Sequence, residues 1–426
     1  MPAGAPDELD WRYAGWRVAL GAGLASMAGF GAILIYSFGV MMKPVTAEFG
    51  WSRQTISTAF ACASFTLGLA SPGLGWMLDR YGPRRVILPC VIVFGLAFSS
   101  LSLLTNSLVQ LFGTFILIGM VGNATAQMGF ARAVSSWFEE HRGKGLALMI
   151  AGGTVGSVFV PLITQRLLAL YGWRSTYAIL GAAPLLIAAP LVVLFVREKT
   201  HHRAVTASVL PSGARLGEAL RSRAFWILAL TLFLTAMSTT GIVTHLAALL
   251  TDRGVSPRGA ALGVSVVAGT GILGRLVTGW FLDRNFGPRV NMVMLFTTAA
   301  GLLLLSGTRS TAGGLVASAL IGFSAGGESD VTPYLLSRYF GLRRFATLYG
   351  LTWTAFAIAA AMGSILLGRA FDSTGSYGTM LIRMATLVLI AGLSMLAMPP
   401  YPDKVELRED CQMAPPGLEP EVPFGV

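Results

Sequence analysis

The sequence predicts an all-α polytopic membrane protein with twelve transmembrane helices, arranged in two six-helix bundles related by a parallel repeat. Three observations support this fold class. Of the 426 residues, 54% are apolar and only 12% are Asp, Glu, Lys or Arg, whereas an ordinary soluble domain has about 25% charged residues. The apolar residues form twelve long segments, and a motif of the first half recurs in the second. This composition excludes a single water-soluble globule.

Each of the twelve apolar segments is long enough to cross a membrane, because a helix of about 20 residues spans the hydrocarbon core. The predicted spans of the first half are residues 16–40, 54–77, 86–105, 108–136, 145–169 and 174–196. Those of the second half are residues 224–251, 257–282, 289–308, 312–339, 344–370 and 378–398. Long continuous runs disfavour a β-barrel, whose short strands alternate in polarity. Helices then satisfy the backbone groups within lipid.

Polar stretches flank and separate the predicted bundles, which cover residues 16–196 and 224–398. We expect a cytosolic N-terminal segment over residues 1–15, a cytosolic linker over 197–223 and a disordered cytosolic tail over 399–426. The first ten residues include three acidic and no basic residues, so the basic start of a secretory signal is missing. The tail is rich in Pro and Glu, a composition typical of disorder.

An internal repeat links the two halves. GWMLDRYGPRR at 75–85 recurs as GWFLDRNFGPR at 279–289, an offset of 204 residues. SSWFEEHRGKG at 135–145 recurs more loosely as SRYFGLRRFAT at 337–347, an offset of 202. Because six spans separate the copies, both point the same way across the membrane, as parallel repeats do.

The net charge of +11 is explained by membrane topology. If both termini lie in the cytosol, 21 of the 31 Lys and Arg residues fall on the cytosolic side, in accordance with the positive-inside rule. We therefore expect no nucleic-acid partner. The three Cys and four His residues form no cluster with metal-ligand spacing, and no phosphate-binding G-x-x-x-x-G-K-[ST] sequence is present. We expect no metal, no cofactor and no enzyme activity.

The repeated motif consists of a glycine, three residues, Asp-Arg and a glycine-basic turn, between spans two and three and again between spans eight and nine. It resembles the loop signature of the major facilitator superfamily, and the resemblance covers roughly residues 16–398. EFGWSR at 48–53, WFEEHRGKGLA at 137–147 and a lone Arg in span eight resemble the monocarboxylate and oxalate/formate porter branch. The resemblance implies secondary active transport by alternating access.

The motif also has a physical rationale of its own. Its glycines permit close helix approach, its aspartates can face a neighbouring helix N-terminus or an Arg, and its basic turn suits the cytosolic surface. We hypothesise a cytosolic latch that forms in only one conformation; the alternative for the arginines is that they only set topology. The candidate latch residues are Gly75, Asp79, Arg80, Arg84, Arg85, Gly279, Asp283, Arg284 and Arg289.

Arg275 is the leading candidate for substrate binding. It lies eight residues before Asp283, about 12 Å along a helix, which places it near the middle of a core roughly 30 Å thick. A central Arg costs about 2.5 to 3.5 kcal/mol and is therefore a functional candidate. Its planar donors suit a carboxylate, and the resemblance implies that an Arg at this place binds the substrate carboxylate. The alternative is a structural pairing with an acid on another helix.

Two acids lie at about the same depth, in GFSAGGESDVTPYLLSRYFG of span ten. Glu328 and Asp330 are two residues apart and point about 200° apart on a helix, so at most one faces a central cavity squarely. An apolar setting favours the neutral form of a carboxyl group, which suits a proton carrier. Either residue is a candidate for proton coupling or gating, and either could pair with Arg275 when the site is empty.

Four further residues are weaker candidates for the substrate site. Asn123 and Gln127 are four apart and share a face of span four; their amides can hydrogen-bond an oxyanion or can hold helices together. Tyr36 in span one and His245 in span seven are the other two. For both, the alternative is an interface anchor or a satisfied core group.

These residues predict a secondary active transporter of a small organic anion, a mono- or dicarboxylate, coupled to protons. We expect a monomer in the lipid bilayer of a bacterial inner (plasma) membrane, with both termini cytosolic. Exchange of one organic anion for another needs no protonatable group and is the main alternative. A membrane sensor without transport is a second alternative, because sequence does not show turnover.

Overall fold

The computed structural model describes residues 10, 12–138, 141–197, 214, 216–282, 284–341 and 345–401. The elements of the first half are α1 (Ala14–Ser26), η1 (Gly31–Ile35), α2 (Tyr36–Phe49), α3 (Arg53–Tyr81), α4 (Pro83–Ser100), η2 (Leu101–Leu103), α5 (Leu108–Gly122), α6 (Gln127–Ser135), α7 (Arg142–Ala183), η3 (Pro184–Ala188) and α8 (Ala189–Phe195). Those of the second half are α9 (Leu216–Arg221), α10 (Arg223–Asp252), α11 (Pro257–Leu282), α12 (Gly287–Gly307), α13 (Thr311–Phe340), α14 (Phe345–Thr374), α15 (Gly378–Ser394) and η4 (Met395–Ala397).

The predicted helical membrane fold is confirmed. In the part of the chain that the structure describes, nine segments are long and apolar enough to cross a membrane by length and composition. One of them, 144–195, holds both the fifth and the sixth span, because the helix kinks at Gly172, where φ is 74°. The first span is longer than predicted and continues to Phe49.

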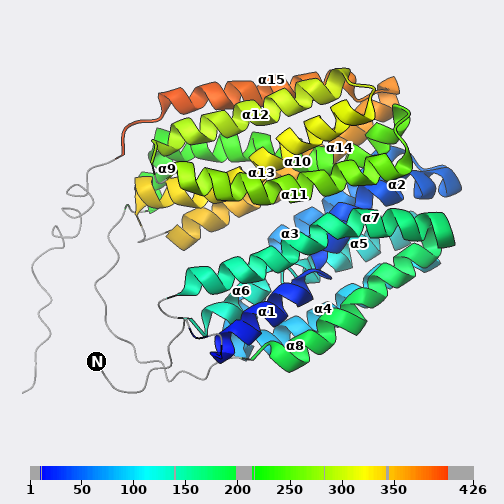
Figure 1. Cartoon of the computed structure of the whole chain (residues 1–426), viewed down its shortest axis with the longest axis horizontal. Coiled ribbons are helices and arrows are strands. Elements are labelled where there is room, and N and C mark those ends of the chain that lie inside the picture. The colour runs from blue at the N-terminus through cyan, green and yellow to red at the C-terminus, as the bar shows by residue number, and fades with distance from the viewer. Residues whose placement is uncertain are drawn as a thin grey trace, which may run out of the picture.

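The two halves form two bundles that lie side by side (Figure 1). Each half has a hydrophobic core of its own. The halves meet mainly where α3 packs along α14 and α7 packs along α11. These contacts join span two to span eleven and span five to span eight. Span eight is the repeat of span two and span eleven is the repeat of span five, so the two contacts are equivalent under the repeat. The repeat seen in the sequence is therefore also a repeat of the interface.

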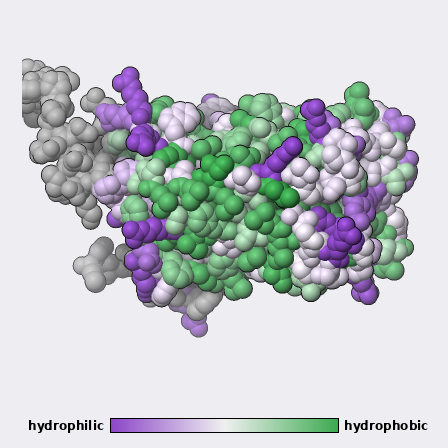
Figure 2. Space-filling model, turned by 90° about the horizontal axis from the view of Figure 1, so that it is seen from above, coloured by the Kyte–Doolittle hydropathy of each residue, from purple (hydrophilic) through white to green (hydrophobic). Residues whose placement is uncertain are grey.

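An apolar belt crosses the visible face of the molecule in Figure 2. Figure 2 shows hydrophobic residues over the middle of the visible face and hydrophilic residues towards both ends. Large apolar side chains are exposed along the membrane-spanning helices, such as Leu186 (75% exposed) and Leu276 (68%). Such an extensive apolar surface is unfavourable in water and is expected next to lipid tails. The belt supports the membrane setting of the fold.

The first and fourth spans, predicted as continuous, are interrupted, and the two interruptions pack together. The backbone N–H of Phe30 donates to the Thr125 hydroxyl (3.2 Å), and this hydroxyl donates to the Gly122 carbonyl (2.9 Å). A Cβ atom at Gly29 would lie 2.1 Å from the Thr125 carbonyl oxygen. Glycine allows this approach, and the Thr side chain satisfies backbone groups that the broken helices leave open.

Helices α11 and α13, which hold Arg275 and Glu328, approach each other through glycines. A Cβ atom at Gly274 would lie 1.8 Å from the Phe323 carbonyl oxygen, and one at Gly326 would lie 1.9 Å from the Gly271 carbonyl oxygen. Small residues permit such backbone contact between membrane helices. The glycines therefore set the distance between the two helices that hold these charged residues.

Gly274→Ala is expected to destabilise the protein by about 1 to 3 kcal/mol, because the new methyl group overlaps a backbone carbonyl and the helices must move apart. Thermal unfolding of the purified protein in detergent measures this effect. Gly350→Ala is the matched control, since a Cβ atom there has nothing within 4 Å. Equal unfolding temperatures for the two variants would contradict the proposed close packing.

Candidate functional site

Polar contacts between the two halves gather at the end of the molecule where α2 passes into α3. Gly50, with φ of 66°, ends α2, and the Ser52 hydroxyl accepts a hydrogen bond from the Thr55 backbone N–H (3.1 Å). This N-cap makes Arg53 the first residue of α3. The turn therefore places a basic side chain at the rim of the first half, facing the second half.

Arg53 is only 8% exposed and makes its contacts across the interface. Its guanidinium donates to both carboxylate oxygens of Asp252 (2.5 and 3.0 Å) and to the Tyr377 hydroxyl (2.6 Å). It also lies 3.6 Å from the ring centroid of Phe371. A bidentate pair with a carboxylate combines charge with fixed geometry. Arg53 is therefore the centre of the polar contacts between the halves at this end.

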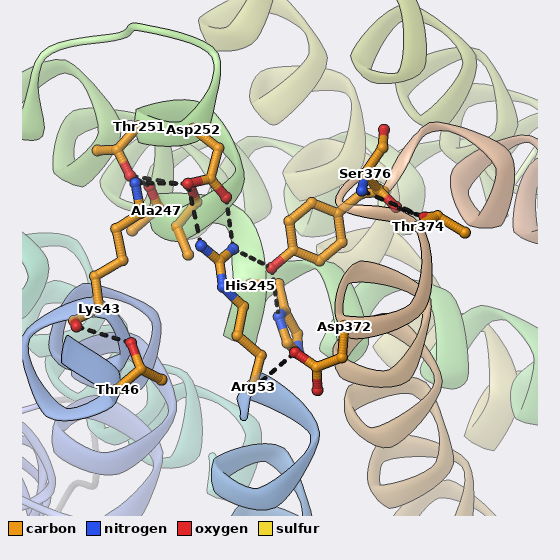
Figure 3. Close-up of polar contacts among 12 residues, drawn as sticks. Lys43, Thr46, Arg53, His245, Ala247, Thr251, Asp252, Asp372, Thr374 and Ser376 are labelled. Carbon is orange, nitrogen blue, oxygen red and sulfur yellow. Dashed lines mark hydrogen bonds and ion pairs between the residues drawn. The ribbon is translucent and has the colours of Figure 1, made fainter. Parts of the chain in front are cut away.

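Two further charged groups complete this contact (Figure 3). The Lys43 ammonium lies 2.6 Å from a carboxylate oxygen of Asp252. The Asp372 carboxylate accepts hydrogen bonds from the backbone N–H groups of Arg53 (3.1 Å) and Gln54 (2.7 Å). A carboxylate is favourable at a helix N-terminus, where the backbone donors lack partners within the helix. Asp372, from the second half, thus caps α3 of the first.

His245 lies deeper at the same interface and has no exposed surface. Its Nε2 atom is 2.9 Å from the Ser57 hydroxyl, in the first half, and 3.0 Å from the Ser364 carbonyl oxygen. Its Nδ1 atom is 3.1 Å from the Tyr377 hydroxyl. We name this group the interhalf cluster, which consists of Lys43, Arg53, His245, Asp252, Asp372 and Tyr377.

The repeat gives Asp252 a counterpart in the first half. EFGWSR at 48–53 matches DRGVSP at 252–257, with Glu48 at the position of Asp252, and Gly50 and Gly254 both have positive φ. Glu48, however, bonds within its own half: it accepts from the Trp173 indole N–H and lies 2.7 Å from the Arg174 guanidinium. The acid at this repeated position therefore bonds within its own half as Glu48 and bonds to the other half as Asp252.

Arg275 and Tyr36, predicted for the substrate site, lie in two helices of opposite halves, α11 and α2, which are in contact. Tyr36 starts α2 directly after the π-helical turn η1, and Arg275 lies in α11. The Tyr36 hydroxyl is within electrostatic reach of the Arg275 guanidinium. π-Helical turns occur frequently at functional sites, where they redirect a side chain. Together the two residues offer hydrogen-bond donors for an anion from both halves.

Glu328 in α13 is 7% exposed and faces α10, where the Thr235 hydroxyl is its hydrogen-bond partner. Its other carboxylate oxygen, Oε1, is buried without a hydrogen-bond partner among the described residues. An ionised carboxylate with an unsatisfied buried oxygen is costly, whereas a protonated carboxyl group is far less so. The arrangement suits a group that binds and releases a proton.

The other predicted site residues have different positions. The Asn123 amide donates to the Ser71 hydroxyl (2.6 Å) and so ties α5 to α3 within the first half. Gln127 begins α6 and Asp330 lies in α13, but their side chains fall outside the described part of the structure. His245 lies in the interhalf cluster. Substrate contact by these residues stays a prediction.

The predicted latch residues lie at the opposite end from the interhalf cluster. Arg80 stacks on Trp76 (5.0 Å) and Arg284 stacks on Trp280 (4.2 Å), so the repeat also holds in these contacts. A Cβ atom at Gly75 would approach the Met128 side chain (2.9 Å), and one at Gly279 would meet nothing within 4 Å. Latch residues that are exposed on the surface include Arg84, Arg85 and Arg289. Asp283 and the side chain of Asp79 lie outside the described residues, so the latch stays a prediction.

Sequence reasoning missed the pairing of Arg53 with Asp252 and the part played by Tyr377 and Asp372. A signal was present, because these charged residues end or begin spans on the same side of the predicted topology. No three His, Cys, Asp or Glu side chains gather into a possible metal site in the part of the chain that the structure describes.

Two repeated six-helix bundles that meet through a polar cluster at one end are the architecture of a membrane transporter. A family model described as Major Facilitator Superfamily matches residues 18–364. The chain belongs to this superfamily.

Similar proteins agree with this assignment. Monocarboxylate transporter 13 of Bos taurus is 28% identical over 404 residues, which cover 93% of this chain and 91% of that protein. The MFS-type transporter YhjX of Escherichia coli is 26% identical over 331 residues, which cover 76% and 81%. A solved variant of the nucleoside transporter NupG has a TM-score of 0.73 at 12% identity, with 90% of this chain and 100% of that chain covered. A bacterial Spinster homologue, described as inward-facing and unoccupied, has a TM-score of 0.65 at 18% identity, with 91% and 94% covered.

Proposed function

We propose that the protein moves a small organic anion, a mono- or dicarboxylate, across the membrane by alternating access, coupled to protons. One observation carries the proposal: Arg275 and Tyr36 bring a guanidinium and a phenolic hydroxyl together from opposite halves, within the membrane-spanning helices. Relatives that are named monocarboxylate transporters support the substrate class.

In this proposal the substrate carboxylate accepts two parallel hydrogen bonds from the Arg275 guanidinium, and the Tyr36 hydroxyl donates a third. The planar fork of Arg matches the two oxygens of a carboxylate. Because the two residues belong to different halves, a bound anion contacts both bundles at once. Its binding energy then differs between conformations that bring the halves together and those that separate them, as alternating access requires.

Glu328 is the proposed proton site. The buried setting of its carboxyl group favours the neutral form, so in this proposal Glu328 carries a proton while the anion is bound and releases it when the site opens to water. Proton and anion then enter together, so little net charge crosses the membrane. The buried Oε1 atom, which has no hydrogen-bond partner among the described residues, is the oxygen that would carry the proton.

Glu328→Gln is expected to abolish accumulation driven by a pH gradient while exchange of labelled for unlabelled substrate survives, because the amide keeps the shape but binds no proton. Uptake of radiolabelled mono- and dicarboxylates into proteoliposomes, with and without a pH gradient, measures both activities. Thr235→Val is a companion variant that removes only the hydroxyl beside Glu328. If gradient-driven accumulation persists in Glu328→Gln, then Glu328 is not the proton site. If the parent protein exchanges substrate but shows no gradient-driven accumulation, anion exchange without proton coupling becomes the better account.

We further propose that the protein is a monomer in a bacterial plasma membrane, with the end that holds the start of α1 and the end of α8 in the cytosol. The excess of basic residues on that side supports this orientation. With Cys62, Cys90 and Cys411 replaced, a cysteine at exposed Asn106 is expected to react with an impermeant thiol reagent in intact cells. A cysteine at Arg84 should react only after permeabilisation, and the reverse pattern would contradict the orientation.

A further inference from the structure

We propose that His245 makes the interhalf cluster sensitive to protons: the cluster closes only around a neutral imidazole, and a second proton on this ring opens that end of the transporter. The proposal concerns the gate and depends neither on the identity of the substrate nor on Glu328.

The contacts of the imidazole define its protonation state in the closed cluster. The Ser364 carbonyl oxygen, 3.0 Å from Nε2, can only accept a hydrogen bond, so Nε2 carries a proton. In a neutral ring Nδ1 is then bare and accepts from the Tyr377 hydroxyl at 3.1 Å. Both ring nitrogens are satisfied, and the closed cluster has no place for a second proton.

Tyr377 transmits this state to the ion pair. Its hydroxyl oxygen accepts a hydrogen bond from the Arg53 guanidinium (2.6 Å), while its single proton points to Nδ1. A proton on Nδ1 would set an N–H donor against this O–H donor, and the hydroxyl proton would have to leave its present partner. The Tyr377 oxygen would then have to accept from both the ring and Arg53, and its own proton would need a new acceptor beside the ion pair.

The charges around the ring add to this effect. The charged groups of the cluster around it are Lys43 from α2, Arg53 from α3, Asp252 from α10 itself and Asp372 from α14, and the Tyr377 hydroxyl beside α15 contacts the ring. The two basic and two acidic side chains balance, so an imidazolium would leave one excess positive charge. With no exposed surface on His245, that charge would lack hydration.

Opening removes the contacts that come from the first half, and without Arg53 the Tyr377 hydroxyl is free to turn its proton away from Nδ1. Ser57 and Arg53 belong to the first half, whereas Ser364 and Tyr377 belong to the second half with His245. If the halves separate at this end, the ring loses the partners of the first half and meets water, where an imidazole binds a second proton near neutral pH. The open state thus binds more protons than the closed state. By linkage, acid on this side favours opening and alkaline conditions favour closure.

Distances between spin labels at the closed end test the proposal in the full-length protein in lipid nanodiscs. Labels on cysteines at Asn106, in the first half, and Ala312, in the second, occupy exposed positions of the two bundles. Between about pH 8 and about pH 5, the range over which an exposed imidazole titrates, the fraction of long distances is expected to rise as pH falls.

Two variants test whether this pH response comes from His245. His245→Gln keeps a donor for Ser364 and an acceptor for Tyr377 but gains no charge, so the short distance should persist at every pH; His245→Asn, which also stays uncharged, should behave alike if the first variant does not fold. Arg258→Lys, a surface substitution at the start of α11, should respond as the parent protein does. A pH-independent distance in the parent, or an unchanged response in a folded His245 variant, would overturn the proposal.

Discussion

Replacing Arg275 by lysine is expected to raise the Km for a transported carboxylate by about 10- to 100-fold. Hydrogen bonds to charged groups contribute about 1.5 to 3 kcal/mol, and lysine keeps the charge but loses the planar pair of donors. A loss of 1.4 kcal/mol corresponds to a factor of about ten in affinity. Initial rates of uptake into proteoliposomes over a range of substrate concentrations measure the change.

The matched control is Arg258→Lys, because Arg258 lies on the same helix but is exposed near the start of α11. Its Km should stay within about twofold of the parent value, as expected for a surface substitution. Tyr36→Phe should have a smaller effect than Arg275→Lys, since it removes one neutral donor. A normal Km for Arg275→Lys would rule out bidentate binding of the carboxylate at this residue.

Replacing Arg53 by methionine is expected to shift the protein towards the state that is open at the interhalf cluster, by about 1 to 3 kcal/mol. Breaking a buried ion pair costs about 3 to 5 kcal/mol, and we expect less here because the Asp252 side chain is 23% exposed and keeps Lys43 as a partner. The matching change in population is about 5- to 150-fold.

Reaction of a buried cysteine measures this opening. Ala248 lies in α10, is 1% exposed and packs with the core of the first half, so a cysteine at this position is covered while the ends are closed. Its reaction with an impermeant thiol reagent should be faster in Arg53→Met by the same factor. Arg174→Met is the control, since it breaks an ion pair at the same end but within one half. Equal rates in the two variants would mean that Arg53 does not hold the halves together.

Much of the fold follows from the sequence. Apolar segments of spanning length and the matched motifs at 75–85 and 279–289 predict helices, bundles and their parallel relation. The interruption at Gly29 and Thr125 does not follow in the same way, because it depends on a contact between two spans that are 95 residues apart, from Phe30 to Thr125. The apolar composition there is the same for a broken and for a continuous helix.

Part of the candidate site can likewise be predicted from the sequence, and part of it cannot. The depth of Arg275 can be counted along a single helix from Asp283, so the sequence is sufficient to single it out. Arg53 and Asp252 lie 199 residues apart, and each looks like an ordinary charge at the end of a span. The partners of His245 come from three other segments, around Ser57, Ser364 and Tyr377. Only the packing of the two halves reveals that these groups act together.

Glu48 and Asp252 have different partners, so the ion pairs at this end do not follow the symmetry of the two bundles. Glu48 binds Trp173 and Arg174 within its own bundle. Asp252, at the matching position of the second half, binds Arg53 and Lys43 of the other bundle. Opening at this end separates Asp252 from Arg53 and leaves the pair of Glu48 with Arg174 intact. One bundle can therefore turn without breaking the ion pair of Glu48, while the ion pair of Asp252 resists that movement at one edge of the interface.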